Sequence, residues 1–238
     1  MVWMAPVKLT ANKEAICSSV TVVSPSTSSR SFRVAAMLAS SAARMSGIVG
    51  SDWVARARRA LADNRLFLEA QPIQPLAPGS LEPPHYELLL RMRDDSGRAV
   101  PPGAFLPTVE RCNLSVRYDR WVIGTALQWM HSHASAMGRV SRFFINLSRD
   151  SVIDPETGAF IRQAIAQAGL DPRRLGFEVA ESIAIANLTR ANHLFNELRR
   201  TGCTVSLDDF GSGVSSFAYL KALGADYLKI DGMFVGNI

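Results

Sequence analysis

The 238-residue sequence lacks the features of several protein classes. No apolar run approaches the roughly 18 residues that a membrane-spanning helix needs, so we expect no transmembrane segment. The three cysteines, Cys17, Cys112 and Cys203, are odd in number and far apart, which argues against a disulfide framework or a zinc knuckle and favours a reducing cytoplasm. The four histidines have no metal-ligand spacing, which argues against a zinc enzyme.

Acidic residues are nearly absent from the first 50 residues, which carry five basic side chains against Glu14 alone. The rest of the chain is close to neutral, although the whole chain has a net charge of +5, so we do not expect a nucleic-acid polymer as partner. Residues 1–50 also hold ten serines and no sustained periodicity. This composition predicts a disordered Ser-rich leader, with a targeting peptide as the alternative.

Beyond the leader, strands and helices alternate. A linker helix is predicted over residues 51–64, because Trp53, Ala57, Ala60 and Leu61 share one side of it. Further helices are predicted over 103–111, 117–133, 158–168, 187–201 and 215–223. The six predicted strands are Leu66–Ile73, Tyr86–Met92, Phe143–Leu147, Phe177–Glu181, Thr204–Asp208 and Tyr227–Asp231. This alternation predicts an α/β fold with a mostly parallel sheet, either open or closed into a barrel.

Five of these strands have one apolar face and one polar face, since successive side chains point to opposite sides of a strand. An open doubly wound sheet buries both faces and is more uniformly apolar, so the pattern favours a (β/α) barrel with polar groups at its active end. The polar face carries Glu87, Asn146, Glu178, Asp208 and Lys229, with Asp209 at a strand end.

Each of these polar residues also has a purely structural interpretation. Glu87 could pair with Arg91, two residues further along the same strand. Asn146 and the Asp208-Asp209 pair could organise turns, and Lys229 could neutralise Asp231. These interpretations stay open for each residue taken alone.

Taken together, the polar residues predict a metal site. Four or more carboxylates on one interior face would repel one another and cost several kcal/mol each to desolvate. Oxygen ligands without histidine or cysteine suit Mg²⁺ or Mn²⁺. Metal-assisted hydrolysis of a phosphate ester fits such a set, and the glycines of Asp209–Gly213 predict a flexible loop over it.

Seven segments, in order along residues 52–238, resemble the EAL-domain cyclic-di-GMP phosphodiesterases. They are Gln71–Ile73, Tyr86–Arg91, Pro101–Pro107, Ile145–Ser148, Phe177–Glu181, Asp208–Gly213 and Tyr227–Asp231. The resemblance implies a TIM-like (β/α) barrel whose first strand is antiparallel. It also implies that one phosphodiester of cyclic-di-GMP is hydrolysed to linear pGpG at a two-metal site for Mg²⁺ or Mn²⁺.

The resemblance further implies a role for each matching residue. Lys229 would contact the attacking water or the phosphate, with Asp231 close by among the substrate contacts, and Glu181 would hold the loop that starts at Phe210. Asp209 would serve the second metal and count with the catalytic residues. The remaining assignments are Glu87, Asn146, Glu178 and Asp208 to the first metal, and Gln71, Leu89 and Arg91 to the dinucleotide.

The sequence also departs from the family pattern. Leu88 stands where the family usually has Ala or Val, but it points away from the polar face. We expect residues 65–238 to form an EAL domain without its last two strands, that is, about six of eight. The alternatives to an active enzyme are therefore an inactive cyclic-di-GMP-binding or interaction module and a truncated fragment. An enolase-type Mg²⁺ barrel is a weaker alternative, and a second copy of the chain is a candidate partner.

Overall fold

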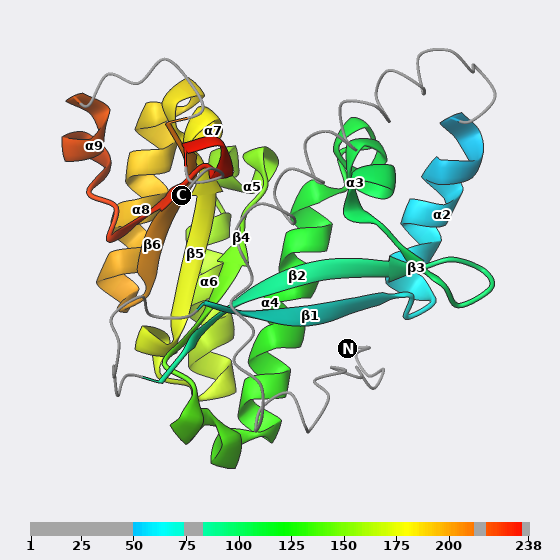
Figure 1. Ribbon diagram of the computed structural model, residues 1–238, viewed down its shortest axis with the longest axis horizontal. Helices are drawn as coiled ribbons and strands as arrows, with labels where there is room; N and C mark the ends of the chain where they lie inside the picture. The colour runs from blue at the N-terminus through cyan, green and yellow to red at the C-terminus, as the bar shows by residue number, and fades with distance from the viewer. Residues whose placement is uncertain (1–49, 74–82, 212–217, 235–238) are drawn as a thin grey trace. The chain divides into compact units, whose positions relative to one another are not determined.

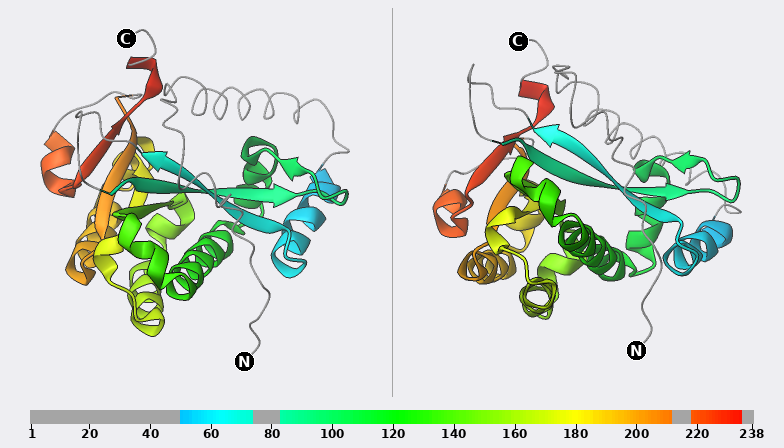
Figure 2. Two further views of the ribbon diagram at one scale, coloured as in Figure 1. Left: turned by 60° about the horizontal axis from the view of Figure 1, so that its bottom comes forward. Right: turned by 90° about the horizontal axis from the view of Figure 1, so that it is seen from below.

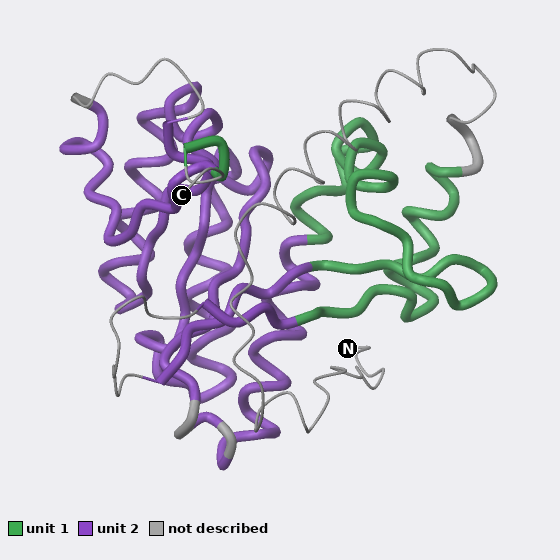
Figure 3. Tube along the Cα trace, viewed as in Figure 1, with its two compact units in different colours: residues 1–69, 90–118, 232–238 green, residues 70–89, 119–231 purple. Residues whose placement is uncertain are grey.

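The computed structural model describes residues 50–73, 83–211 and 218–234 (Figure 1). The chain forms two compact units (Figure 3): residues 1–69, 90–118 and 232–238 make unit 1, and residues 70–89 and 119–231 make unit 2. Apart from Gly50, the predicted leader lies outside the described residues. None of the described helices is both long and apolar enough to cross a membrane.

The sheet has the strand order β1-β2-β4-β5-β6-β7, with the short β3 beside β2. Pairing is parallel from β2 through β4, β5 and β6 to β7. The end of β2 lies beside the start of β1, because Arg93 N donates to Arg65 O, as in an antiparallel pair. The strands are β1 Leu66–Ile73, β2 His85–Arg93, β3 Ala99–Val100, β4 Arg142–Asn146, β5 Leu175–Ala180, β6 Thr204–Phe210 and β7 Tyr227–Ile230. The six predicted strands are thus confirmed, while β3 was not predicted.

The predicted helices are confirmed with two additions. The structure adds α5, and it places α7 before the predicted helix at 187–201. Asn187 separates α7 from α8 because its backbone is not helical (φ −133°, ψ 42°) and its Nδ2 donates to Ile183 O. The predicted positions 215–217 lie outside the described residues. The helices are α2 Gly50–Ala62, α3 Pro102–Arg111, α4 Ser115–Ser132, α5 Arg149–Ile153, α6 Thr157–Ala168, α7 Glu181–Ala186, α8 Leu188–Thr201 and α9 Ala218–Leu223, with 3₁₀ turns η1 Ala134–Arg139, η2 Pro172–Arg174 and η3 Gly232–Phe234.

The core of unit 2 lies between the sheet and the helices. In Figure 2, α4, α6 and α8 lie on one side of β4, β5 and β6. The strand residues on that side are fully buried, among them Ile145, Phe177, Val179, Val205 and Leu207. Each such side chain contributes about 1.5–3 kcal/mol of burial free energy. The apolar faces of β4, β5 and β6 are therefore committed to the core, whereas Leu228 and Ile230 on β7 are exposed.

Unit 1 has its own small core around α2 and α3. Ala57 and Ala60, on the predicted apolar side of the first helix, are buried. Tyr118 Oη donates to Ala57 O at 2.8 Å, and the Tyr118 ring lies 6.4 Å from the ring of the buried Phe105. Burial raises the pKa of Tyr118 to about 12, so this hydroxyl stays a donor at physiological pH.

Candidate functional site

The strand register collects the predicted polar residues on one face of unit 2. Asn146 pairs in register with Glu178. Glu178 pairs with Ser206, and Ala180 with Asp208. Residues in register on parallel neighbours point to the same side, so this face lies opposite the buried core face. The face predicted from residue alternation is therefore the one that the structure forms.

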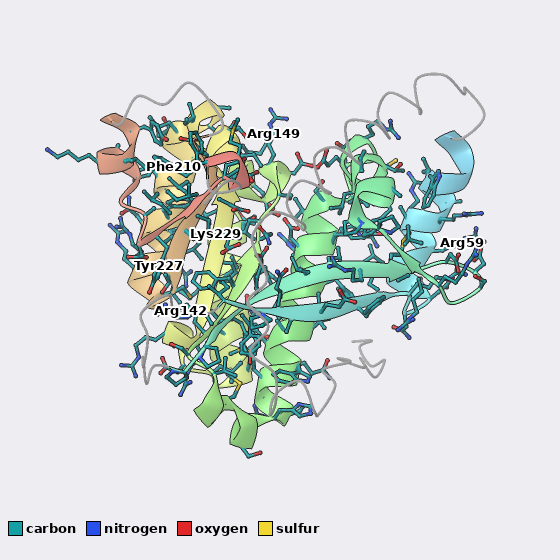
Figure 4. The ribbon with its side chains drawn as sticks, in the orientation of Figure 1. Arg59, Arg142, Arg149, Phe210, Tyr227 and Lys229 are labelled. Atoms are coloured by element: carbon teal, nitrogen blue, oxygen red, sulfur yellow. The ribbon has the colours of Figure 1, made fainter. Side chains whose placement is uncertain are left out.

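Lys229, on β7 and labelled in Figure 4, lies among three carboxylates of this face. Its Nζ lies 3.0 Å from Glu87 Oε2 and 2.6 Å from Glu178 Oε2. It also lies 3.4 Å from Asp208 Oδ1. Asn146 extends the cluster, because its Nδ2 donates to Glu87 Oε1 at 2.8 Å. Five predicted site residues from five strands thus form one connected network.

The network rules out two structural interpretations that the sequence left open. Glu87 does not pair with Arg91, because Arg91 Nε donates instead to Glu69 Oε2 at 2.7 Å. Lys229 contacts Glu87, Glu178 and Asp208, so its charge is balanced across the sheet and not by Asp231. Neither partner was visible in the sequence, because each pairing depends on the register between strands.

Three ionisable side chains of the cluster have shifted pKa values. Burial raises the pKa of Glu178 to about 8, with Lys229 opposing the shift and Glu87 and Asp208 adding to it. Burial likewise raises the pKa of Asp208, again against the effect of Lys229. Burial alone would lower the pKa of Lys229, but the three carboxylates outweigh it and raise that pKa. The face therefore places three carboxyl groups around one ammonium group, and burial disfavours the ionised form of Glu178 and Asp208.

A β-bulge shapes the site where β6 ends. The β6–β7 register shifts between Leu207 and Phe210, so one more residue lies on β6 than on β7. Asp209, inside the bulge, has the left-handed backbone angle φ +56°, which is uncommon for a residue other than glycine. Asp209 N donates to Asp208 Oδ1 at 2.9 Å. Bulges and strained backbone of this kind concentrate beside active sites.

Glu181, the first residue of α7, anchors the chain after this bulge. Its side chain is almost fully buried. Its Oε2 accepts from Gly211 N at 2.9 Å, and its Oε1 accepts from Tyr219 Oη on α9. The Glu181 carboxylate thus binds one residue before and one residue after segment 212–217. This segment, which includes part of the predicted loop Asp209–Gly213, lies outside the described residues.

The predicted substrate contacts are divided between the units. Gln71 on β1 and Leu89 on β2 belong to unit 2, and both are partly exposed. Asp231, directly after β7, also belongs to unit 2, and its N donates to Phe210 O at 3.1 Å. Arg91 belongs to unit 1, where it makes the Glu69 ion pair.

Aromatic side chains lie two residues before Asn146 on β4 and two residues before Lys229 on β7. The Phe144 ring lies 5.9 Å from the Tyr227 ring, and Arg142 donates to Tyr227 Oη at 3.3 Å (Figure 4). Gly176 makes room for Phe144, since a Cβ at Gly176 would lie 2.4 Å from that ring. The polar cluster therefore lies next to a layer of packed aromatic side chains.

Sequence reasoning missed two polar residues near the site. Ser206 is fully buried beside Glu178, and its Oγ has no hydrogen-bond partner within the described residues. Asp119 on α4 binds Ser148, two residues after Asn146. The helical spacing in the sequence could have indicated Asp119, because it lies three and four residues before the buried Val122 and Ile123 and so shares their side of α4. A carboxylate on the apolar side of a helix is a polar residue that needs a partner.

Comparison with known proteins identifies the family. The family model described as "EAL domain" matches residues 54–238. The chain belongs to the EAL-domain family. The expected resemblance is thereby confirmed, and the fold described above is that of an EAL domain.

Curated relatives of this EAL domain are named as phosphodiesterases. Cyclic di-GMP phosphodiesterase PdeF of Escherichia coli is 39% identical over 183 residues, which are 77% of this chain and 24% of the relative. Cyclic di-GMP phosphodiesterase PdeB of Shewanella oneidensis is 35% identical over 186 residues, or 78% of this chain and 22% of the relative. The chain thus spans about a quarter of the length of these relatives.

Solved structures of EAL domains resemble the chain closely. The FimX EAL domain of Pseudomonas aeruginosa bound to c-di-GMP has a TM-score of 0.72 and 31% identity, covering 79% of this chain and 74% of that one. The PaMucR phosphodiesterase in its c-di-GMP complex has a TM-score of 0.69 and 32% identity, covering 76% and 72%.

The donor chemistry of this EAL domain fits Mg²⁺ or Mn²⁺. The face offers carboxylate and amide oxygens, and Glu178 Oε1 is buried without a hydrogen-bond partner in the described part of the chain. The carboxylates are arranged around Lys229, however. No three His, Cys, Asp or Glu side chains among the described residues already converge as a metal-binding group. A cation bound here would therefore share the carboxylates with the ammonium of Lys229.

Proposed function

We propose that this chain hydrolyses one phosphodiester bond of cyclic-di-GMP to give linear pGpG, with Mg²⁺ or Mn²⁺ bound. The observation that carries this proposal is the cluster itself, in which the Lys229 ammonium lies within 3.4 Å of Glu87, Glu178 and Asp208. A partly buried cluster of carboxylates is stabilised by cations, and it faces the same side as Asn146. The names of the relatives PdeF and PdeB support the choice of substrate.

In this proposal each residue keeps one role. The metal ligands are Glu87, Asn146, Glu178 and Asp208, with Asp209 serving a second ion. A bound divalent cation would supply a water of lowered pKa and stabilise negative charge on the phosphate oxygens. Lys229 would hold the phosphate or the attacking water by its ammonium group. Glu181 would keep the Gly211 backbone in place, and the contacts to the dinucleotide would come from Gln71, Leu89, Arg91 and Asp231.

A second candidate is a module that binds cyclic-di-GMP without hydrolysing it. The observation that favours it is the arrangement of the carboxylates around Lys229, without a converged metal-binding group in the described residues. The two candidates share the nucleotide and differ in whether a product is released.

The test combines binding and turnover for the 238-residue chain. Cyclic-di-GMP binding would be measured by calorimetry, and pGpG would be measured by chromatography in the presence of Mn²⁺. Glu178→Gln removes one charge from the cluster, while Glu156→Gln makes the same change at an exposed site. We expect pGpG from the native chain and from Glu156→Gln, and at least 100-fold less from Glu178→Gln, in line with the loss of a metal ligand's charge.

If the native chain binds cyclic-di-GMP but forms no pGpG, the binding module replaces the enzyme as the function of this chain. A folded chain with neither binding nor product would refute both candidates.

A further inference from the structure

One half-buried carboxylate lies beside the site without being part of the Lys229 cluster. Asp119, on α4, accepts three hydrogen bonds through the single atom Oδ2 (Figure 1 shows α4, β4 and α5). Ser148 N donates to it at 2.9 Å and Ser148 Oγ at 2.6 Å. Ser151 Oγ donates to it at 2.6 Å. All of these residues belong to unit 2.

These contacts fix the backbone directly after Asn146, the last residue of β4. Leu147 N donates to Glu178 O on β5 at 2.8 Å. Ser148 N donates to Asp119 on α4. The two residues that follow Asn146 are therefore each held by a different element, and Asn146 leaves the sheet in one defined direction. In that direction its Nδ2 reaches Glu87 Oε1.

Helix capping alone does not account for Asp119. Ser148 already caps α5, because its Oγ accepts from Ser151 N at 3.3 Å, and a serine N-cap suffices for most helices. The partners of Asp119 within the described residues are neutral serine groups, and burial raises the pKa of its carboxyl against their effect. A carboxylate that is partly removed from water without a cation beside it lowers stability, and polar groups that do so are concentrated at functional sites.

We propose that Asp119 is a positioning residue, which acts through Ser148 to hold Asn146 against Glu87. This proposal rests on the proposed function, in which Asn146 is a metal ligand. Groups that orient a metal ligand from behind typically change metal affinity about 10–100-fold when they are removed. Asp119 on α4 thus helps to position the side-chain amide oxygen of Asn146 in the site.

The first test measures the position of Asn146 directly. In ¹⁵N NMR spectra of the 238-residue chain, the side-chain amide of Asn146 is assigned by its loss in Asn146→Ala. We expect Asp119→Ala and Ser148→Ala to shift or broaden this signal. Asp119→Asn should restore it, because its amide oxygen can still accept hydrogen bonds from Ser148 N and Oγ. The matched control is Val152→Ala, which weakens the packing of α5 without touching the carboxylate.

The second test measures Mn²⁺ affinity by calorimetry without nucleotide. We expect binding about 10-fold weaker in Asp119→Ala and within twofold of native in Asp119→Asn and Val152→Ala. An unchanged Asn146 signal in Asp119→Ala, or an equal change in Val152→Ala, would overturn the proposal. If Asp119→Ala does not fold, Ser148→Ala decides in its place. A native chain that binds no Mn²⁺ would refute the proposed function, while the NMR signal would still decide the role of Asp119.

Discussion

Removing the charge of Lys229 tests how far the carboxylate cluster depends on this one ammonium group. In Lys229→Met the side chain keeps its length, but Glu87, Glu178 and Asp208 lose the cation that lies 2.6–3.4 Å away. Glu178 is only 1% exposed, so water cannot replace the lost partner there. Removing one partner of a buried ion pair costs about 3–5 kcal/mol, and we expect about 3 kcal/mol because Asp208 is 27% exposed.

The expected loss is large enough to measure by thermal or urea unfolding. For a chain of this size, about 3 kcal/mol lowers Tm by about 6–12 °C. The unfolding should be followed without metal ions at pH 8, which is near the raised pKa of Glu178, so that this carboxyl is partly ionised in the native chain. Adding Mn²⁺ should recover part of the loss, since a ligand that binds only the folded state stabilises it.

The control is Lys221→Met, which removes an exposed lysine on α9 and should change the unfolding free energy by less than about 0.5 kcal/mol. The reasoning is refuted if Lys229→Met unfolds at the native temperature in the absence of metal. It is also refuted if Lys221→Met loses as much stability as Lys229→Met.

Two further predictions concern packing and pH. Gly176→Ala should lose about 1–3 kcal/mol in urea unfolding, because its Cβ would meet the Phe144 ring, whereas Gly124→Ala on the exposed side of α4 should gain about 0.5–1 kcal/mol; equal effects would contradict the packing described here. Burial raises the pKa of Cys203 to about 12, so at pH 9 its thiol keeps its proton and should resist iodoacetamide in the folded chain, while the partly exposed Cys112 reacts. Mass spectrometry of the labelled peptides checks this, and modification of Cys203 at the rate of Cys112 would count against its burial.

Residue alternation predicted the face of the site because β4, β5 and β6 each have one side buried in the core. Glu87, Asn146, Glu178 and Asp208 all alternate with buried apolar residues, and the parallel register carries this alternation from strand to strand. Lys229 was predicted from the apolar residues Leu228 and Ile230 on either side of it, although the structure leaves both of these exposed. The sequence pattern therefore predicts which residues lie on this face, although it does not predict which of them contact one another.

The features that sequence reasoning missed depend on interactions between distant segments. The bulge at Asp209 breaks the two-residue period, so the strand was predicted to end at Asp208, whereas β6 continues to Phe210. The Arg91–Glu69 pair joins neighbouring strands 22 residues apart. Asp119 and Ser148 are 29 residues apart and meet only because α4 packs beside the end of β4.

The most direct test of the account is pGpG formation by the metal-stripped chain as Mn²⁺ is added back. The account predicts no product before the addition, product that rises and saturates with Mn²⁺, and almost none at any concentration for Glu178→Gln. Product formed equally well without added metal, or by Glu178→Gln as by the native chain, would contradict the claim that the Lys229 carboxylate cluster is a metal-dependent phosphodiesterase site.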